Sequence, residues 1–151
     1  MDDGAAIPRT RTALEAHLTK LGVSEQGYHL SGAHLDDAIV MDHCPEGWVV
    51  FYSERGGESA LKVHRTEADA CADLLDRRTR DDHAFFTLVA GPSPASEADT
   101  AFNSWLAARG ASRSSLLAED WKFDDVPWVA GPLWRRYFVR TTTIRLLDRA
   151  E

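Results

Sequence analysis

The stretch that decides the fold spans residues 47–75 and reads GWVVFYSERGGESALKVHRTEADACADLL. Side chains alternate across a strand, so the start of this stretch presents two faces. These faces are Trp48, Val50 and Tyr52 on one side and Val49, Phe51 and Ser53 on the other. Gly56 and Gly57 favour a hairpin turn, because glycine adopts positive φ angles without steric cost. Residues 60–64 are then predicted to return as the partner strand.

A helix is predicted directly after this hairpin. Thr66 is a typical N-cap residue, and Asp69 lies three residues on, near the positive end of the helix dipole. A strand, a turn, a second strand and a helix in such close succession indicate an α+β fold. We therefore expect antiparallel strands in one or two small sheets, with helices packed on one face.

Capping patterns predict two more helices. Thr12 opens the first, which Gly22 ends, and Ser96 opens another, which Gly110 ends. A further strand is expected at 38–41. The segment 116–134 has an irregular pattern, whereas aromatic and β-branched residues predict one long or bent strand over 134–147. We expect Trp48 and Phe102 to anchor the cores of their respective parts.

The chain is predicted to form a single compact domain of two parts. Residues 1–9 are expected to be a flexible tail, and 10–90 a helix, hairpin and helix part. The sequence Gly-Pro-Ser-Pro-Ala at 91–95 has the composition of a linker, and 91–151 would be a second helix-plus-strand part packed on the first. The two parts echo each other at an offset of 88 residues. Diverged duplication and a coincidence of ordinary helix punctuation both explain that echo.

Composition bounds the class of protein. A chain of 151 residues with 44% hydrophobic content is large enough for a substantial core and is not generally disordered. No apolar run approaches the roughly 20 residues that a membrane span needs. The N-terminus lacks the basic-then-apolar order of a secretory signal, so we expect a cytoplasmic protein that does not bind membranes. Two cysteines do not make a disulfide framework.

Charge is distributed unevenly along the chain. Residues 1–90 carry 9 positive and 16 negative side chains, whereas 91–151 carry 8 of each, so the first part holds the whole net charge of −7. A negative field disfavours phosphate backbones and favours basic partners. Solubility is the other explanation of the same excess.

No motif of catalysis or metal binding is present. Asp42, His43 and Cys44 are adjacent, but zinc sites use close pairs such as CxxC, and neighbouring strand residues point to opposite faces. No serine lies in a GxSxG elbow, and Gly56–Gly57 is not followed by the Lys-Ser/Thr of a phosphate loop. We therefore predict no catalytic residue, no metal and no cofactor.

Arginines alternate with aromatic residues near the C-terminus. They are Arg135, Arg136, Arg140 and Arg145. Basic strands with exposed rings can bind single-stranded nucleic acid, but the net charge of −7 argues against such a footprint. We expect these arginines to pair with the many acidic side chains instead.

The remaining candidate is a surface for a protein partner. Acidic residues near the first hairpin are expected to form a rim around exposed rings. The predicted partner-binding residues are Asp36, Asp37, Asp42, Trp48, Tyr52, Glu54, Arg55 and Glu58, with Glu46 and Tyr28 close by. Acidic and aromatic side chains together suit recognition of a basic protein.

The same region resembles a known family. Leu-Gly-Val at 21–23, Gly-Tyr-x-Leu at 27–30, GWVVFYSERG at 47–56 and Thr-Glu-Ala-Asp-Ala-Cys at 66–71 resemble small acidic immunity proteins. Such proteins are encoded beside secreted toxins in GC-rich bacteria, including toxins of the NAD-glycohydrolase type. The resemblance covers about residues 12–78. It implies stoichiometric inhibition of a partner toxin by occlusion of its active site, without catalysis.

The alternative is a small enzyme or small-molecule-binding protein with an aromatic cleft between the two parts. Its lining would include Trp105, Trp121, Trp128 and Trp134.

Overall fold

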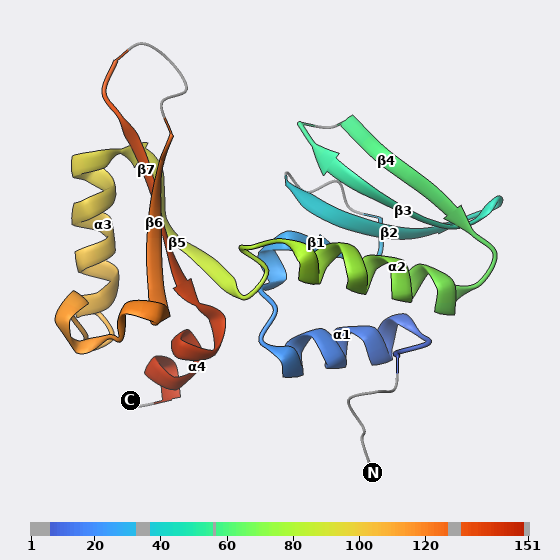
Figure 1. The fold of residues 1–151 in the computed structure, drawn as a ribbon, viewed down its shortest axis with the longest axis horizontal. Helices are drawn as coiled ribbons and strands as arrows, with labels where there is room; N and C mark the ends of the chain where they lie inside the picture. The colour runs from blue at the N-terminus through green and yellow to red at the C-terminus, as the bar shows by residue number, and fades with distance from the viewer. Residues whose placement is uncertain (1–6, 33–36, 56, 127–130, 150–151) are drawn as a thin grey trace. The chain divides into compact units, whose positions relative to one another are not determined.

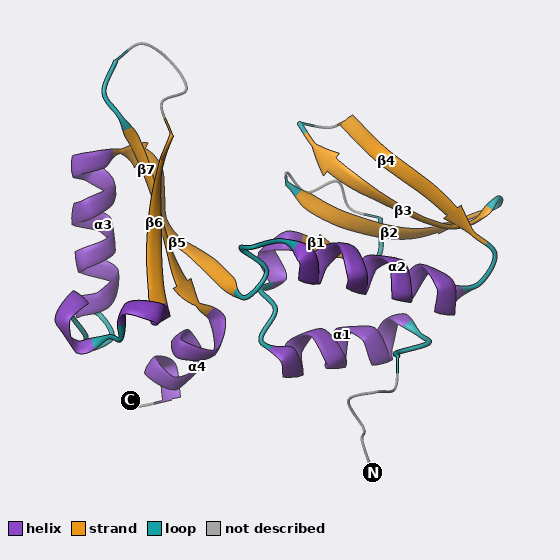
Figure 2. Cartoon of the chain, in the orientation of Figure 1, coloured by secondary structure: helices purple, strands orange, loops and turns teal. Residues whose placement is uncertain are grey.

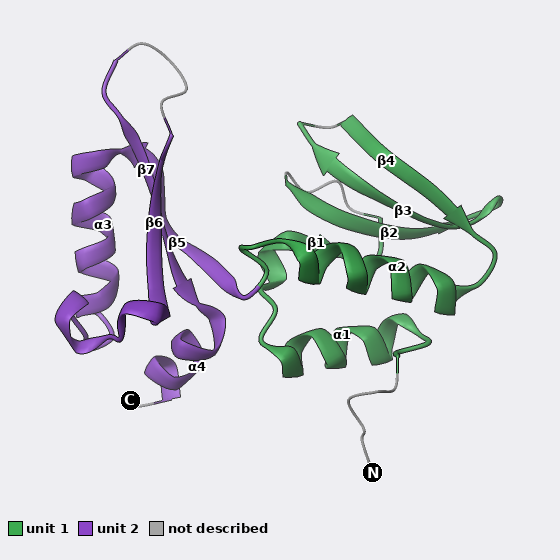
Figure 3. Ribbon diagram, in the orientation of Figure 1, with its two compact units in different colours: residues 1–84 green, residues 85–151 purple. Residues whose placement is uncertain are grey.

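A computed structural model describes residues 7–32, 37–55, 57–126 and 131–149. The chain divides into two compact units, Met1–Ala84 and Phe85–Glu151 (Figure 3). Each unit contains helices and a sheet of mainly antiparallel strands, so the predicted α+β class is confirmed (Figure 2). None of the helices within the described ranges is long and apolar enough to cross a bilayer.

Unit 1 combines a four-stranded sheet with two helices. Its elements are α1 (Arg11–Leu21), the short 3-10 helix η2 (Glu25–Gly27), β1 (Tyr28–His29), β2 (Ala38–Cys44), β3 (Gly47–Glu54), β4 (Gly57–His64) and α2 (Glu67–Arg80). The strand order is β1-β2-β3-β4, with β1 parallel to β2 and the other pairs antiparallel. Helix α2 lies along the sheet, and α1 lies against α2 (Figure 1).

The helix boundaries of unit 1 follow local capping chemistry. The Thr66 hydroxyl accepts a hydrogen bond of 3.1 Å from the Asp69 amide, which confirms the predicted cap. Gly22 ends α1 at a φ of 86°, as predicted. The N-cap of α1 is Thr10 rather than Thr12. A cap needs an extended backbone, and Thr12 already lies inside the helix.

The predicted alternation along β3 is confirmed. His64 lies directly opposite Trp48 and bonds to Asp73 of α2, so the face with Trp48 and Val50 turns toward that helix. Val50 is fully buried there. On the other face, Phe51 belongs to a separate buried cluster with Ala38 and Val40. Trp48 itself is only half-buried, so it is not the fully buried anchor we expected.

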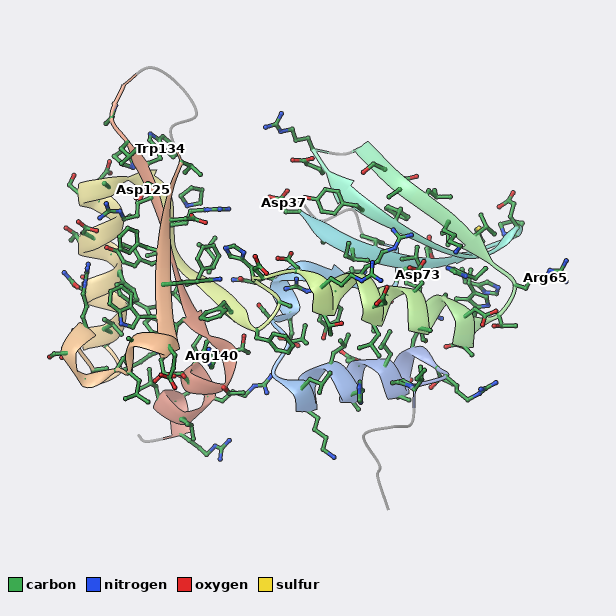
Figure 4. All side chains as sticks on the ribbon, viewed as in Figure 1. Asp37, Arg65, Asp73, Asp125, Trp134 and Arg140 are labelled. Atoms are coloured by element: carbon green, nitrogen blue, oxygen red, sulfur yellow. The ribbon has the colours of Figure 1, made fainter. Side chains whose placement is uncertain are left out.

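One polar contact ties the end of the hairpin to α2. His64 Nε2 lies 2.8 Å from Asp73 Oδ2, and the Arg77 guanidinium donates to the same carboxylate at 2.8 and 3.2 Å. Figure 4 labels Asp73 on this helix. Burial opposes ionisation of Asp73, but the hydrogen bonds and charges of Arg77 and His64 outweigh it and lower the pKa of the carboxyl. The carboxylate is therefore stabilised in its charged form.

Unit 2 combines a three-stranded sheet with two helices. Its elements are β5 (Phe86–Pro94), α3 (Ala95–Ala107), the 3-10 helices η3 (Arg113–Ser115) and η4 (Ala118–Asp120), β6 (Trp121–Val126), β7 (Trp134–Arg140) and α4 (Thr141–Arg149). The antiparallel order is β5-β7-β6, and α3 lies against β5 and β7 (Figure 1).

The predicted linker at 91–95 is wrong, because most of it belongs to β5. This strand lies at the edge of its sheet, where proline's missing N–H costs no ladder hydrogen bond. Gly91 has a φ of 85°, and a Cβ there would come within 2.2 Å of the Arg135 carbonyl oxygen. Glycine is therefore required by the close approach of β7. The unit boundary consequently falls after Ala84 rather than after residue 90.

The prediction for residues 134–147 is also wrong. Strand β7 stops at Arg140, and α4 begins with three threonines. The Thr141 amide donates to the Phe85 carbonyl at 2.9 Å, and its hydroxyl lies 3.0 Å from that of Thr87. These contacts hold the first residue of α4 beside β5, and the helix begins there despite the β preference of threonine. The segment expected to be irregular likewise contains β6, which pairs along β7.

Helix α3 starts without the expected side-chain cap. Its N-cap is Pro94, and no side chain bonds the first amides. The carboxylate of Asp99 instead accepts hydrogen bonds from the Tyr137 hydroxyl and, at 3.0 Å, from Arg135. The two β7 side chains hold Asp99 on the side of the helix facing the sheet. The resulting pKa of Asp99 is lowered, first by Tyr137.

The core of unit 2 is an aromatic stack. Phe102 of α3 and Tyr137 of β7 are both fully buried, with ring centroids 4.3 Å apart and planes 11° from parallel. Trp121 lies 5.4 Å from Phe102. The guanidinium carbon of Arg113 lies 5.0–5.6 Å from all three ring centroids. Phe102 is thus the core anchor that the sequence predicted.

Duplication stays a prediction. Trp48 and Trp134 both lie near the start of an inner strand of their sheets. The helices matched by the offset pack differently, however, because α1 lies against another helix and α3 against its sheet.

Replacing Phe102 with alanine should lower the free energy of unfolding of unit 2 by about 3–5 kcal/mol, because a fully buried ring leaves a cavity. Leu146→Ala is the control, since Leu146 is 62% exposed, and it should change stability by about 0.5 kcal/mol or less. Denaturant unfolding followed by near-UV circular dichroism measures both. Equal stabilities of the two variants would contradict the assignment of Phe102 as the core anchor of unit 2.

Replacing Asp73 with asparagine should destabilise unit 1 by about 1–3 kcal/mol at pH 7. Because the pKa of Asp73 is lowered on folding, its contribution is complete above the unfolded value of about 3.9 and is lost as pH falls through the folded value. The difference between parent and variant should therefore shrink below about pH 4. Asp76→Asn removes an exposed pair with Arg80 on the same helix and should cost about 0.5 kcal/mol or less.

Candidate partner-binding surface

Five of the eight predicted residues gather at one end of the unit 1 sheet. There β2 begins and β3 turns into β4, with Ala38 opposite Ser53 and Ser53 opposite Glu58. We call this surface the hairpin end. Its members are Asp37, Tyr52, Glu54, Arg55 and Glu58. Asp36 lies outside the described residues.

Tyr52 and Asp37 form the ordered part of the hairpin end. The Tyr52 hydroxyl donates to Asp37 Oδ1 at 2.7 Å, and Figure 4 labels Asp37. Asp37 adopts a φ of 55°, a conformation that aspartate and asparagine tolerate better than most residues. Burial, followed by the Asp37 hydrogen bond and charge, raises the pKa of Tyr52. Tyr52 therefore stays protonated and keeps Asp37 at the surface as an acceptor.

The hairpin tip adds exposed charge. Glu54, Arg55 and Glu58 all have exposed side chains, and Glu54 pairs with Gly57 across the turn. The hairpin end therefore presents three described carboxylates and one guanidinium beside a half-buried ring.

Asp42 and Trp48 do not belong to this surface. Asp42 lies opposite Val49, so it points to the other face of the sheet from Trp48. Its carboxylate accepts a 2.8 Å hydrogen bond from the His43 amide. Trp48 is near the opposite end of β3, stacked 4.1 Å from the His43 ring. The predicted rim around both rings is therefore not formed, because the register of β2 and β3 separates its members.

Arg11 is a structural residue that sequence reasoning missed. Its guanidinium carbon lies 5.0 Å from the Trp48 ring, and its Nη1 donates to the Leu30 carbonyl at 3.0 Å. Its amide also donates to Glu67 at 2.7 Å. Arg11 thus joins α1, β3 and α2. No local pattern predicts contacts so distant in the sequence.

A small hollow is the second feature that the sequence did not predict. It encloses about 270 Å³ beside α1, η2 and β1. Its lining residues are Glu15, Glu25, Tyr28, His29, Leu30 and Ser31. We call it the acidic hollow. Tyr28, which we had expected beside the rim, is 6% exposed and lies here instead.

The described residues give no support to a metal site or to a reactive cysteine. They contain no group of three His, Cys, Asp or Glu side chains placed to hold a metal ion. Cys71 is fully buried, and burial raises the pKa of its thiol to about 11. It therefore remains a protonated packing residue at neutral pH. The Cys44 thiol donates to the Gly47 carbonyl at 3.4 Å, within the turn between β2 and β3.

Two of the three arginines of β7, Arg135 and Arg136, pair with acidic residues as predicted, whereas Arg140 donates to the Glu119 backbone carbonyl at 2.9 Å. Arg135 donates two hydrogen bonds of 2.5 and 3.1 Å to the Asp125 carboxylate. Arg136 donates two of 2.9 and 2.8 Å to the Asp124 carboxylate. These bidentate pairs occupy the guanidinium donors that a phosphate would need. The Arg140 guanidinium lies over the Phe86 ring, 4.8 Å from its centroid.

The tryptophans proposed to line a cleft have structural roles in unit 2. Trp121 packs on the buried stack of Phe102 and Tyr137. Trp105 lies under the Arg109 guanidinium at 4.0 Å. Trp134 begins β7, and Trp128 lies outside the described residues.

Comparisons with known proteins give no match. Neither the protein-family models, nor the curated proteins, nor the solved structures contain one that resembles this chain significantly. The functional argument therefore depends on the geometry and charge of the chain itself.

Replacing Asp37 with asparagine should lower the pKa of Tyr52, because the change removes a negative charge while keeping a side chain that tolerates positive φ. The pKa should remain above the ordinary value of about 10, because burial still opposes ionisation. The ¹³Cζ resonance of Tyr52, followed by NMR from about pH 9 to 12, reports this directly. Asp42→Asn makes the same chemical change elsewhere on β2 and should leave the titration unaltered. Identical curves for parent and Asp37→Asn would contradict the hydrogen bond.

Proposed function

We propose that this chain is a binding protein of the immunity type, which inhibits a basic partner toxin by covering its active site. The observation that carries the proposal is the confinement of excess charge to unit 1. Residues 1–84 contain 9 basic and 16 acidic side chains, whereas 85–151 contain 8 of each. A charge excess that served only solubility would have no reason to be restricted to one unit.

Ion pairs within unit 1 engage several of its few basic side chains. Three arginines of α2 are each held by an aspartate in or next to that helix. The pairs are Arg77–Asp73, Arg78–Asp81 and Arg80–Asp76. These cations neutralise acids in or next to α2, so their charges do not add to the positive charge near the hairpin end.

The mechanism requires no bond-making step. A basic toxin surface would be attracted over the Debye length of about 8 Å at physiological salt. The hairpin end would then dock beside the toxin's active site, and the body of unit 1 would exclude its substrate. Such an inhibitor acts at a ratio of one to one and regains its original state when the complex dissociates.

The decisive experiment measures stoichiometric inhibition. The full-length chain, immobilised, is used to capture proteins from its native host, and each captured protein is then purified and assayed with added chain. The proposal requires a captured protein whose toxic or enzymatic activity falls to zero at one equivalent. Capture without loss of activity, or loss that needs catalytic turnover by this chain, would overturn it.

Neutralising two carboxylates of the hairpin end should slow association with that partner. Glu54→Gln with Glu58→Gln changes the net charge from −7 to −5. We expect the association rate to fall about threefold to tenfold at low salt and the difference to shrink at high salt. Stopped-flow mixing at two salt concentrations measures both.

The matched control is Glu97→Gln with Glu119→Gln, which makes the same charge change on exposed residues of unit 2. Its association rate should stay close to that of the parent. Equal slowing by both pairs would assign the effect to net charge rather than to the hairpin end.

A further inference from the structure

The acidic hollow is built from three consecutive elements of unit 1. Glu15 comes from α1, Glu25 is the first residue of η2, and Tyr28 begins β1 (Figure 1). The Ser24 hydroxyl accepts from the Gln26 amide at 3.3 Å and thereby fixes the turn that carries Glu25. Pairing of Tyr28 with Ile39 fixes β1 on the sheet. Both carboxylates are therefore carried by ordered backbone.

The negative charge of the hollow is not neutralised by the nearest basic residue of α1. Arg11 lies one turn before Glu15, but its side chain is engaged by the Leu30 carbonyl and the Trp48 ring. Its amide and guanidinium also meet Glu67, at 2.7 and 3.9 Å. Within the described residues, neither Glu15 nor Glu25 has a hydrogen bond or ion pair, and both are exposed.

Tyr28 supplies a second, independent feature of the hollow. Only 6% of the Tyr28 surface is exposed, yet its hydroxyl makes no hydrogen bond of ordinary geometry with the described residues. Burial, then the charges of Glu25 and Glu15, raises the pKa of Tyr28, while Arg78 and a polar contact with Thr19 act in the opposite sense. The phenol thus lies within the field of both carboxylates and has an oxygen able to accept a hydrogen bond.

We infer that the acidic hollow is an anchor site for one arginine or lysine side chain of the basic partner, an inference that rests on the proposed function. A guanidinium or ammonium group entering the hollow would meet two carboxylates, while the buried Tyr28 side chain forms part of the lining. Ion pairing and charge-assisted hydrogen bonds to the two carboxylates then act together. A hollow of about 270 Å³ suits one extended side chain rather than a folded segment.

Arg78 is a fixed positive charge close to the hollow. Its guanidinium is buried beside Gly27, where a Cβ would come within 2.2 Å of it, and its Nη1 bonds Asp81 at 3.3 Å. It lies close enough to Tyr28 to affect the phenol's pKa. This charge is paired with Asp81 and opposes any incoming cation, so the attraction must come from the carboxylates of Glu15 and Glu25. The hairpin end would speed encounter, whereas the hollow would slow dissociation.

The first test uses the full-length chain and a defined probe. N-acetyl-arginine methylamide is titrated into the ¹⁵N-labelled protein, and the amides of Glu15, Glu25 and Ser31 are followed by NMR. We expect saturable shifts at these amides and none with the citrulline analogue, which has a similar shape without the charge. Shifts that do not saturate, that lie elsewhere, or that occur equally with citrulline would overturn the site.

Matched variants separate the site from net charge. Glu15→Gln with Glu25→Gln should weaken binding of the arginine probe about tenfold. Glu54→Gln with Glu58→Gln, which makes the same change in charge at the hairpin end, should leave the dissociation constant within about twofold. All four side chains are exposed, so each variant should fold. Equal weakening by both pairs would overturn the inference.

A second measurement distinguishes this inference from the proposed function. With the inhibited partner in hand, Glu15→Gln with Glu25→Gln should raise the dissociation rate about tenfold. An unchanged dissociation rate would overturn the anchor while leaving the inhibitory function intact. Conversely, a probe that binds in the hollow of a chain that inhibits no basic partner would overturn the proposed function and the partner assignment, but leave a cation site.

Discussion

In each unit, an inner strand that is hydrogen-bonded on both sides carries side chains that pack against a helix. Strand β3 lies between β2 and β4, and β7 lies between β5 and β6. Because successive side chains point to opposite faces, such a strand must bury one row against a helix. In unit 1 this row includes Val50, which faces α2. In unit 2 it includes Tyr137, whose ring stacks on Phe102 of α3. The remaining elements are positioned by these two contacts.

The placement of basic side chains connects the fold to the proposed function. In unit 2, Arg135 and Arg136 are consumed by bidentate pairs with aspartates of β6, which balances the charge and strengthens the sheet. In unit 1, the arginines of α2 satisfy acids of the same helix or its C-terminal end. The side chains of Glu54 and Glu58 at the hairpin end, and of Glu15 and Glu25 at the acidic hollow, are exposed. The asymmetry of the sequence becomes an asymmetry of the surface, which is what recognition of a basic partner needs.

Features that depend on neighbouring residues could be predicted from the sequence, whereas features that depend on distant partners could not. The β3–β4 hairpin, the Thr66 cap and the end of α1 at Gly22 depend on neighbours within a few residues, and all three were predicted. The segments that were predicted wrongly depend on distant partners. Residues with linker composition form β5 because they pair with β7, and α4 begins at Thr141, whose amide and hydroxyl contact Phe85 and Thr87. Asp99 was expected to take part in capping α3, but its carboxylate accepts a hydrogen bond from the Tyr137 hydroxyl instead.

The candidate site shows the same division. By itself, the sequence determined the α+β class, the alternation of β3, the N-terminal concentration of acid and the lack of catalytic motifs. Those properties are set by local backbone preferences and by counting charges. Only the tertiary structure decided that Tyr52 and Asp37 meet while Asp42 and Trp48 lie elsewhere, since strand register fixes which side chains share a face. It alone also brought Glu15, Glu25 and Tyr28 around one hollow, because residues on separate elements converge only when the chain has packed.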